Sequence, residues 1–161
     1  MFLQETPKLL WQPPEEGWIK INVGGNYVKA MGEASGGVII RDHKGCVHLS
    51  SWRYMFQCTS VEEAELLAWK EGLWLAHQWC DSPVILESDC SSCVAALAKH
   101  EINRSIYASL VENSENIMRM LENVRLVKFN REQNIVAHEL AQHARRAFSS
   151  EVWLSEIPSC I

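Results

Sequence analysis

The sequence of 161 residues lacks an excess of basic residues. Its 15 lysines and arginines are outnumbered by 20 aspartates and glutamates, so the formal net charge is −5 at pH 7. Strong non-specific affinity for nucleic acids comes mainly from lysines and arginines that neutralise phosphates. The charge balance therefore argues against such affinity over the whole surface, and leaves room for a local basic face.

Long hydrophobic runs and a signal peptide are also missing. The N-terminal stretch MFLQETPKLLW has neither a basic beginning nor a long apolar run, and no uninterrupted apolar segment approaches the roughly 18 residues of a membrane span. No internal repeat or low-complexity tract is visible. We therefore expect an intracellular protein, cytoplasmic or nuclear, with no membrane partner and with its six cysteines reduced.

The apolar content of the chain fits one compact α/β domain. Hydrophobic residues make up 47% of the sequence, enough for a sizeable core. We predict a lead-in arm over residues 1–16, the folded domain over 17–150 and a C-terminal tail over 151–161. Trp69, Trp74 and Trp79 recur along one segment, and we interpret them as core residues of a helix.

The hydrophobic pattern predicts strands and helices in the order β-β-β-α-β-α-α-β-α. The expected strands cover residues 18–23, 35–41, 46–52, 84–88 and 124–129. The expected helices cover residues 61–77, 91–99, 105–123 and 134–148, the first with Ser60 as N-cap and Glu63 completing a capping box. Three strands followed by two helical crossovers predict a mixed sheet with helices packed against it.

Glu65 is the first candidate for chemistry. It lies on the same side of the first predicted helix as a stripe of small and apolar residues that should face the sheet. A carboxylate in that position is costly unless it is paired, hydrogen-bonded or metal-bound. The alternative is an acid at the rim of the core that still reaches solvent.

Asp89 and His138 are the other candidates. Asp89 ends an apolar strand, at the sheet edge where ligand sites of α/β proteins gather, but its local sequence favours a role as the cap of the following helix. His138 lies at the edge of the apolar stripe of the last helix, from which it reaches either the sheet edge or solvent. His138 and His143 are five residues apart and point about 140° away from one another, which excludes a zinc-protease motif.

Cys90 and Cys93 form a CxxC motif at a strand-to-helix junction. A helix N-terminus lowers the pKa of a thiol, so a redox dithiol is one interpretation. A zinc site would need two further ligands, and no other cysteine or histidine has a spacing that supports one. We favour the third interpretation, in which both cysteines are small buried residues.

Several ordered motifs together resemble a known family. They are GWIKINVGGN, GGVIIRDHKG, SVEEAELLAWKEGLWLA, VILESD and REQNIVAHELAQHA. Over roughly residues 11–148 they are similar to the plant reverse-transcriptase-like branch of the ribonuclease H superfamily. The resemblance implies an α/β ribonuclease H-like fold, with a five-stranded mixed sheet in the order 3-2-1-4-5 and helices on both faces.

The resemblance also implies a two-metal site. In active members, acidic side chains hold two Mg²⁺ or Mn²⁺ ions that activate water and stabilise the departing oxygen while the RNA strand of an RNA/DNA hybrid is cut. The metal-binding glutamate of the family matches Glu65, and the aspartate after the fourth strand matches Asp89. The last acid of the family falls on His138, and histidine is frequent there in plant relatives.

The first-strand aspartate of the family is replaced by Gly24. That aspartate binds both ions, so the resemblance implies a degenerate site with weakened metal binding. We expect a catalytically impaired module, in effect a pseudoenzyme, that binds RNA/DNA hybrid or other nucleic acid or has a regulatory role. The alternatives are a protein–protein interaction scaffold, and a weak metal-dependent hybrid endonuclease that uses Glu65, Asp89 and His138.

Overall fold

The computed structural model describes residues 10–55, 57–98, 106–121, 123–159 and 161. The strands are β1 (Ile19–Val28), β2 (Glu33–Asp42), β3 (Val47–Met55), β4 (Val84–Ser88), β5 (Val124–Lys128) and β6 (Glu151–Leu154). The helices are α1 (Val61–Trp79), α2 (Ser91–Ala98), α3 (Ala108–Met120) and α4 (Ile135–Ala147), and a 3-10 turn, η1 (Arg131–Gln133), precedes α4. The predicted helix ends at Lys99 and Ser105 lie outside the described residues.

The strands form one mixed sheet in the order β5-β4-β1-β2-β3-β6. Strand β1 pairs with β2, and β2 with β3, in antiparallel fashion, whereas β4 is parallel to both β1 and β5. The predicted fold class and the order 3-2-1-4-5 are therefore confirmed. The sheet has six strands rather than the five expected, because residues from the predicted C-terminal tail form β6, which pairs with β3 from Leu49↔Leu154 to Trp52↔Glu151.

Strand β1 is longer than predicted. The expected end at Val23 is wrong, because the pairing with β2 continues without interruption from Ile19↔Asp42 to Val28↔Glu33. Gly24 and Gly25 are therefore strand residues and not a turn. Glycine inside a strand often marks a close backbone approach, and two helices approach β1 at these two positions.

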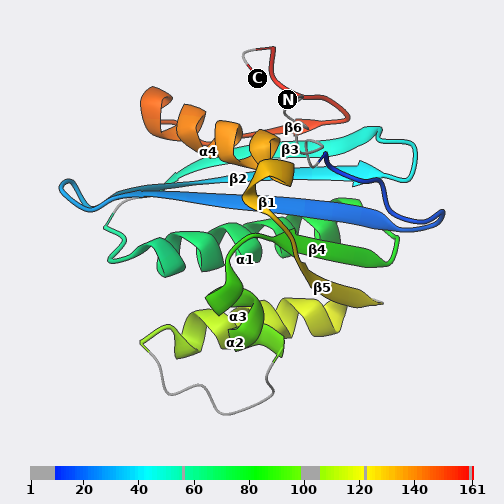
Figure 1. The fold of residues 1–161 in the computed structure, drawn as a ribbon, viewed down its shortest axis with the longest axis horizontal. Coiled ribbons are helices and arrows are strands. Elements are labelled where there is room, and N and C mark those ends of the chain that lie inside the picture. The colour runs from blue at the N-terminus through cyan, green and yellow to red at the C-terminus, as the bar shows by residue number, and fades with distance from the viewer. Residues whose placement is uncertain (1–9, 56, 99–105, 122, 160) are drawn as a thin grey trace, which may run out of the picture.

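The helices lie on both faces of the sheet (Figure 1), as predicted, with α4 on one face and α1 on the other. The core on the α1 side includes Ile21, Trp69 and Leu73, all fully buried, and the core under α4 includes Ile39 and Leu140. No helix within the described part of the chain combines the length and the apolar character needed to cross a membrane.

The tryptophans of α1 do not form a core stripe. Trp69 is fully buried, but Trp74 is 45% exposed and Trp79 is 59% exposed. Successive tryptophans are five residues apart, so each is turned by about 140° around the helix from the one before it. The interpretation of all three as core residues was therefore wrong for Trp74 and Trp79.

The N-terminus of α1 is capped as expected at Ser60. The Ser60 hydroxyl accepts a hydrogen bond from the Glu63 N–H at 3.1 Å. The Glu63 carboxylate does not return to the backbone of Ser60, as a full capping box would require. It accepts from the N–H of Thr59, one residue earlier, at 2.6 Å. These two hydrogen bonds fix the residue at which α1 begins. Glu65 lies in the second turn of the helix.

Candidate metal centre

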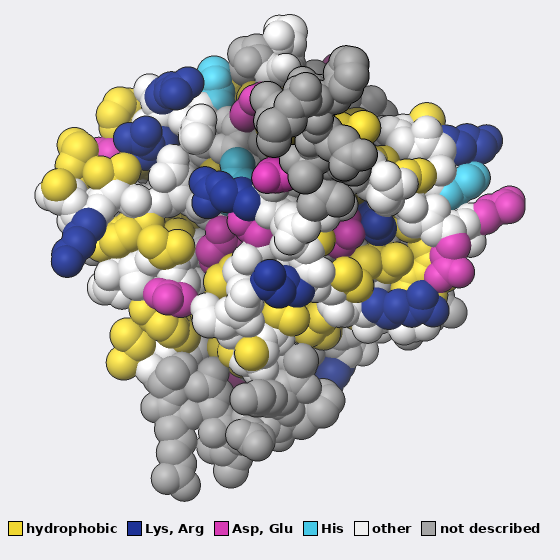
Figure 2. Space-filling model, in the orientation of Figure 1, with side chains coloured by type: hydrophobic (Ala, Val, Ile, Leu, Met, Phe, Trp, Pro, Cys, Tyr) yellow, Lys and Arg dark blue, Asp and Glu magenta, His cyan; other side chains and the backbone are white. Residues whose placement is uncertain are grey.

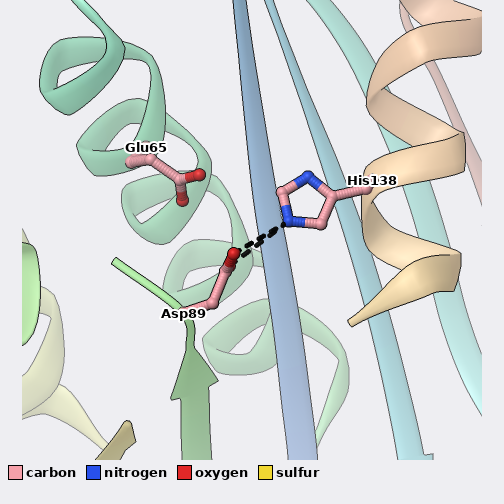
Figure 3. A group of neighbouring side chains, drawn as sticks. All are labelled: Glu65, Asp89 and His138. Carbon is pink, nitrogen blue, oxygen red and sulfur yellow. Dashed lines mark hydrogen bonds and ion pairs between the residues drawn. The ribbon is translucent and has the colours of Figure 1, made fainter. Parts of the chain in front are cut away.

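Three side chains from different elements converge beside β1. Glu65 comes from α1, Asp89 follows the end of β4, and His138 comes from the first turns of α4. Figure 3 shows Glu65 and His138 on opposite sides of β1, with Asp89 between them. One potential ligand atom of each lies within 4.8 Å of the others. The structure therefore brings together all three residues that the sequence analysis singled out.

Glu65 is buried rather than at a solvated rim, since it is 4% exposed. Its Oε1 accepts a hydrogen bond from the Gly25 N–H at 3.0 Å, and its Oε2 is buried without a partner among the described residues. Burial raises the pKa of Glu65 to about 8. The hydrogen bond from Gly25 lowers this pKa, and the negative charge of Asp89 raises it further. Without a cation, this carboxyl group therefore holds its proton at neutral pH.

Gly25 allows Glu65 to reach this position. A Cβ atom at Gly25 would lie 2.8 Å from the backbone nitrogen of Glu65 and 3.0 Å from the carbonyl carbon of Ala64. Contacts that short do not occur, so α1 approaches β1 this closely only because residue 25 has no side chain. The close approach places the Gly25 N–H within hydrogen-bonding distance of the buried carboxyl group.

Asp89 faces the site and does not cap α2. That helix begins at Ser91, and the Val94 N–H donates to the Cys90 carbonyl at 3.1 Å. The carboxylate of Asp89 instead lies 3.2 and 3.3 Å from Nε2 of His138. Burial raises the pKa of Asp89, but the hydrogen bond and charge of His138 outweigh burial, so the pKa lies below its ordinary value.

Asn134 is a site residue that the sequence analysis missed. It is 1% exposed, and its side-chain N–H group donates to the Val23 carbonyl at 2.7 Å and to Oδ1 of Asp89 at 3.1 Å. It thereby ties the start of α4 to β1 and to the end of β4. The one available signal was a polar residue one helical turn before His138, which the pattern indicated only as a helix start.

Gly24 lies directly against α4. A Cβ atom built on it would lie 3.0 Å from Nδ1 of His138 and 3.1 Å from both the His138 nitrogen and the carbonyl carbon of Ala137. A side chain at residue 24 would therefore begin in tight contact with α4, which would have to shift by a few tenths of an ångström to admit it. The absence of a side chain at residue 24 and the close packing of α4 are two aspects of one arrangement.

The donor set fits one divalent cation. Glu65 and Asp89 supply carboxylate oxygens, and the unpartnered Oε2 of Glu65 is the kind of buried polar atom that a cation would satisfy. Carboxylate oxygens suit both Mg²⁺ and Mn²⁺, whereas the imidazole of His138 is a ligand that Zn²⁺ or Fe²⁺ would prefer. A second ion would need further negative charge, and Gly24 supplies none.

On the face drawn in Figure 2, the described residues form no continuous basic field. Figure 2 shows lysine and arginine side chains scattered over the viewed face, with acidic side chains between them. Arg131 of η1 is close enough to Glu65 for its charge to lower the pKa of that carboxyl group. This pattern agrees with the net charge of −5.

Comparison with known proteins adds a family match and several structural neighbours. Residues 22–144 match the family model described as reverse transcriptase-like. No curated protein sequence matches the chain significantly. Ribonuclease H1 of the archaeon Halobacterium salinarum superimposes with a TM-score of 0.75 at 15% identity, over 81% of this chain and 99% of that one.

Two further solved structures are similar. The N-terminal RNase H domain of a Mycobacterium tuberculosis protein, fused to maltose-binding protein, has a TM-score of 0.75 at 16% identity, over 82% of this chain and 96% of that one. LC11-RNase H1, from a compost metagenome, was solved in complex with an RNA/DNA hybrid. It has a TM-score of 0.73 at 24% identity, over 81% of this chain and 99% of that one. These likenesses show the ribonuclease H-like fold.

Proposed function

The chain belongs to the reverse-transcriptase-like family. We propose that it is a ribonuclease H-like domain with a degenerate two-metal site. It acts as a nucleic-acid-binding or regulatory module that does not cut its ligand efficiently. The observation that carries this proposal is the absence of a side chain at Gly24, combined with the tight packing of α4 against the position where that side chain would begin. The plant branch of the family and a cytoplasmic or nuclear location are part of the same proposal.

Gly24 matters because two cations can be held only where enough negative charge is fixed around them. Two-metal catalysis needs enough fixed negative charge to hold two cations close together, and the ions then orient water and absorb the charge that develops on the phosphate. Here Asp89 is ionised, Glu65 is protonated at neutral pH in the absence of a cation, and His138 contributes no negative charge. Glu65 and Asp89 would hold a single Mg²⁺ or Mn²⁺ ion, with Gly25 and Asn134 orienting the two carboxylates.

An RNA/DNA hybrid is the ligand class that we propose. LC11-RNase H1 was solved with such a hybrid, and nearly all of that chain superimposes on this one. The two carboxylates lie at the end of β4 and in the second turn of α1, so a hybrid bound at the centre would cross β1 near Gly24. The modest basic content predicts weak affinity that depends on salt.

A binding assay tests the nucleic-acid function. We expect the full chain to bind a labelled RNA/DNA hybrid at low salt, with an affinity that falls steeply as salt is raised. Single-stranded RNA and a DNA duplex of the same sequence serve as ligand controls. No measurable binding at low salt would contradict the proposal and favour the scaffold.

A gain-of-function variant tests the impaired centre. We expect Gly24→Asp to bind Mn²⁺ more tightly than the parent chain and Gly24→Asn to leave Mn²⁺ binding unchanged, because only the aspartate adds charge. The double variant Gly24→Asp/His138→Asp removes the imidazole that lies 3.0 Å from the position of the new Cβ. It should bind the metal more tightly still and cut the hybrid. If neither aspartate variant gains metal affinity, this centre is not a degenerate two-metal site.

A specific surface feature favours a protein scaffold as the second candidate function. A cavity of about 620 Å³ lies between α1, α3 and the end of β3, with Trp74 at its wall. Its remaining lining includes Arg53, Met55, Leu67, Glu71 and Ile117. Trp74→Ala should abolish binding of a protein partner on this surface and leave hybrid binding unchanged.

Residual nuclease activity is the third candidate. If the parent chain cuts a labelled hybrid in Mg²⁺ or Mn²⁺, Glu65→Gln should abolish the cutting, since it replaces a proposed ligand by a neutral side chain of similar shape. Cutting that is unchanged in Glu65→Gln would come from another site or from a contaminating nuclease.

A further inference from the structure

The cysteine pair at the start of α2 has no role in the proposed function. Cys90 follows Asp89 directly, and its carbonyl accepts the first helical hydrogen bond of α2, from the Val94 N–H. Cys93 lies in the first turn of that helix. The two Sγ atoms are 2.6 Å apart, and both cysteines are free. The interpretation as two small buried residues holds for Cys93 but not for Cys90, which is half-buried, and the contact brings the two thiols together.

Closure of a disulfide requires little movement. The S–S bond of a disulfide is about 2.05 Å long, so the two sulfur atoms need to approach by only about half an ångström. Because the cysteines are three positions apart at the start of one helix, the backbone already holds their side chains on the same face. The other described cysteines lie elsewhere in the chain, among them Cys46, which is exposed just before β3, and Cys80, which is half-buried just after α1.

The pair differs in accessibility, which sets the order of reaction. Cys90 is half-buried, whereas Cys93 is 2% exposed. A cavity of about 440 Å³ lies on the Cys93 side of the pair, and Cys90 is not among the residues that line it. Its lining residues are Glu62, Leu66, Ser92, Cys93, Ala96, Tyr107 and Val111. The walls are mainly apolar and carry a single carboxylate, so the cavity suits a small uncharged molecule better than an anionic one.

We propose that Cys90 and Cys93 form a redox-active dithiol, which a small uncharged disulfide oxidises to an intramolecular disulfide. The proposal rests on the contact between the two sulfur atoms and on the greater exposure of Cys90. It stands whether or not the chain binds nucleic acid.

The reaction is two successive thiol–disulfide exchanges. The Cys90 thiol gives a proton to water, and its sulfur attacks one sulfur of the small disulfide, forming a mixed disulfide and releasing one thiolate. The Cys93 thiol then gives up its proton, and its sulfur attacks Sγ of Cys90 and displaces the second thiolate. The protein loses two protons and two electrons, and the small disulfide, after protonation, becomes two thiols.

Peptide mapping of the full chain tests this reaction. The reduced protein is incubated with 2-hydroxyethyl disulfide, quenched with N-ethylmaleimide and cut with trypsin and a protease that cleaves before aspartate. This digestion places Cys90 and Cys93 together on peptide 89–99 and separates them from Cys80. We expect peptide 89–99 to lose two hydrogens and take up no maleimide after oxidation, and to take up two maleimides after treatment with dithiothreitol.

Cys46 provides an internal control, since it is an exposed single thiol. The protein is titrated with mixtures of 2-hydroxyethyl disulfide and 2-mercaptoethanol. The ratio of reagent disulfide to reagent thiol that oxidises half of the Cys90–Cys93 pair should be at least tenfold lower than the ratio that modifies half of Cys46. Cys93→Ala should stop the reaction at the mixed disulfide on Cys90. Because Cys93 is buried, the parent map decides the question even if that variant fails to fold.

Three outcomes would overturn the proposal. They are two maleimides on peptide 89–99 after oxidation, a mixed disulfide at Cys90 in the parent chain that never closes, and pairing of either residue with Cys80.

Discussion

Glu65 shows at the scale of one residue how burial sets the properties of the centre. In the unfolded chain its carboxyl group titrates near its ordinary pKa of 4.5, whereas in the folded chain burial raises the pKa to about 8. The folded state therefore binds more protons between these two values. Stability from this group is fully present below about pH 4.5 and is lost as the pH rises through about 8.

We predict that Glu65→Gln removes this part of the pH dependence. The parent and the variant should have similar free energies of unfolding near pH 4.5, because glutamine resembles the protonated acid in shape and can accept the Gly25 hydrogen bond. At pH 8.5 the variant should be more stable, by an amount on the order of a few kcal/mol. Urea unfolding across this pH range measures the difference. A difference that stays constant with pH would contradict the raised pKa.

The two adjacent glycines of β1 should differ in their tolerance of a methyl group. A Cβ atom at Gly25 meets backbone of α1 at 2.8 Å, and one at Gly24 meets α4 at 3.0 to 3.1 Å. We predict that Gly25→Ala costs about 1–3 kcal/mol of stability, as overpacking usually does, and that Gly24→Ala costs less. Thermal unfolding of the pair measures both. Equal losses of stability in the two variants would mean that α1 shifts away from β1 as easily as α4 does, and would contradict this prediction.

At the scale of elements, strand β6 protects the edge of β3 and brings an aromatic cluster with it. The ring of Trp153 lies edge-on to Trp52 at a centroid distance of 4.2 Å, and Trp52 also packs against His143 at 4.1 Å. The Ser50 hydroxyl donates to the Glu156 carbonyl at 2.6 Å, just beyond the strand. The C-terminal segment is therefore fastened to the sheet by packing as well as by backbone pairing.

We predict that Trp153→Ala destabilises the protein by about 1–3 kcal/mol, through lost burial and the lost aromatic pair. Glu151→Ala is the matched control, since Glu151 is exposed on the same strand and should change stability by less than about 0.5 kcal/mol. Denaturant unfolding compares the two. Equal effects would show that β6 contributes only through its backbone.

Most elements, and three of the residues that meet at the candidate site, could be recognised from the sequence because their signals are local. Glu65 stood out as an acid within a stripe of small residues, and Asp89 as an acid at the end of an apolar strand. Asn134 could not be recognised, because both of its acceptors, on Val23 and Asp89, are distant in the sequence. Strand β6 was missed for the same reason, since its partner β3 is distant in the sequence. The extension of β1 pairs with the next strand, from Gly24↔Gly37 to Val28↔Glu33, and was missed because Gly24 and Gly25 interrupt the alternation of apolar and polar residues.

At the scale of the whole molecule, cation binding should couple to stability and pH together. A ligand that binds only the folded state adds about 2.7 kcal/mol at a concentration one hundred times its dissociation constant. Glu65 must lose its proton to become a ligand, so Mn²⁺ affinity should rise as the pH approaches about 8. We therefore predict that Mn²⁺ raises the melting temperature more at pH 8 than at pH 6.

Thermal unfolding with and without Mn²⁺ measures this coupling. Glu65→Gln should lose most of the shift and its dependence on pH. Glu63→Gln is the control, because Glu63 lies on the same helix but binds Thr59 at the surface. A shift that is equal at both pH values would place the ion elsewhere.

The bond from Asn134 to Val23 has a consequence for the order in which the molecule is made. Its partners are 111 residues apart, an interval that a ribosome covers in on the order of ten seconds at roughly 5–20 residues per second. During that time β1, α1 and β4 leave the ribosome before α4 does, so the face of the sheet that α4 covers in the folded protein is still exposed to solvent. A nascent chain that stalls before residue 134 carries both carboxylates but has neither the imidazole nor the amide that holds them. Translation itself therefore completes the centre last.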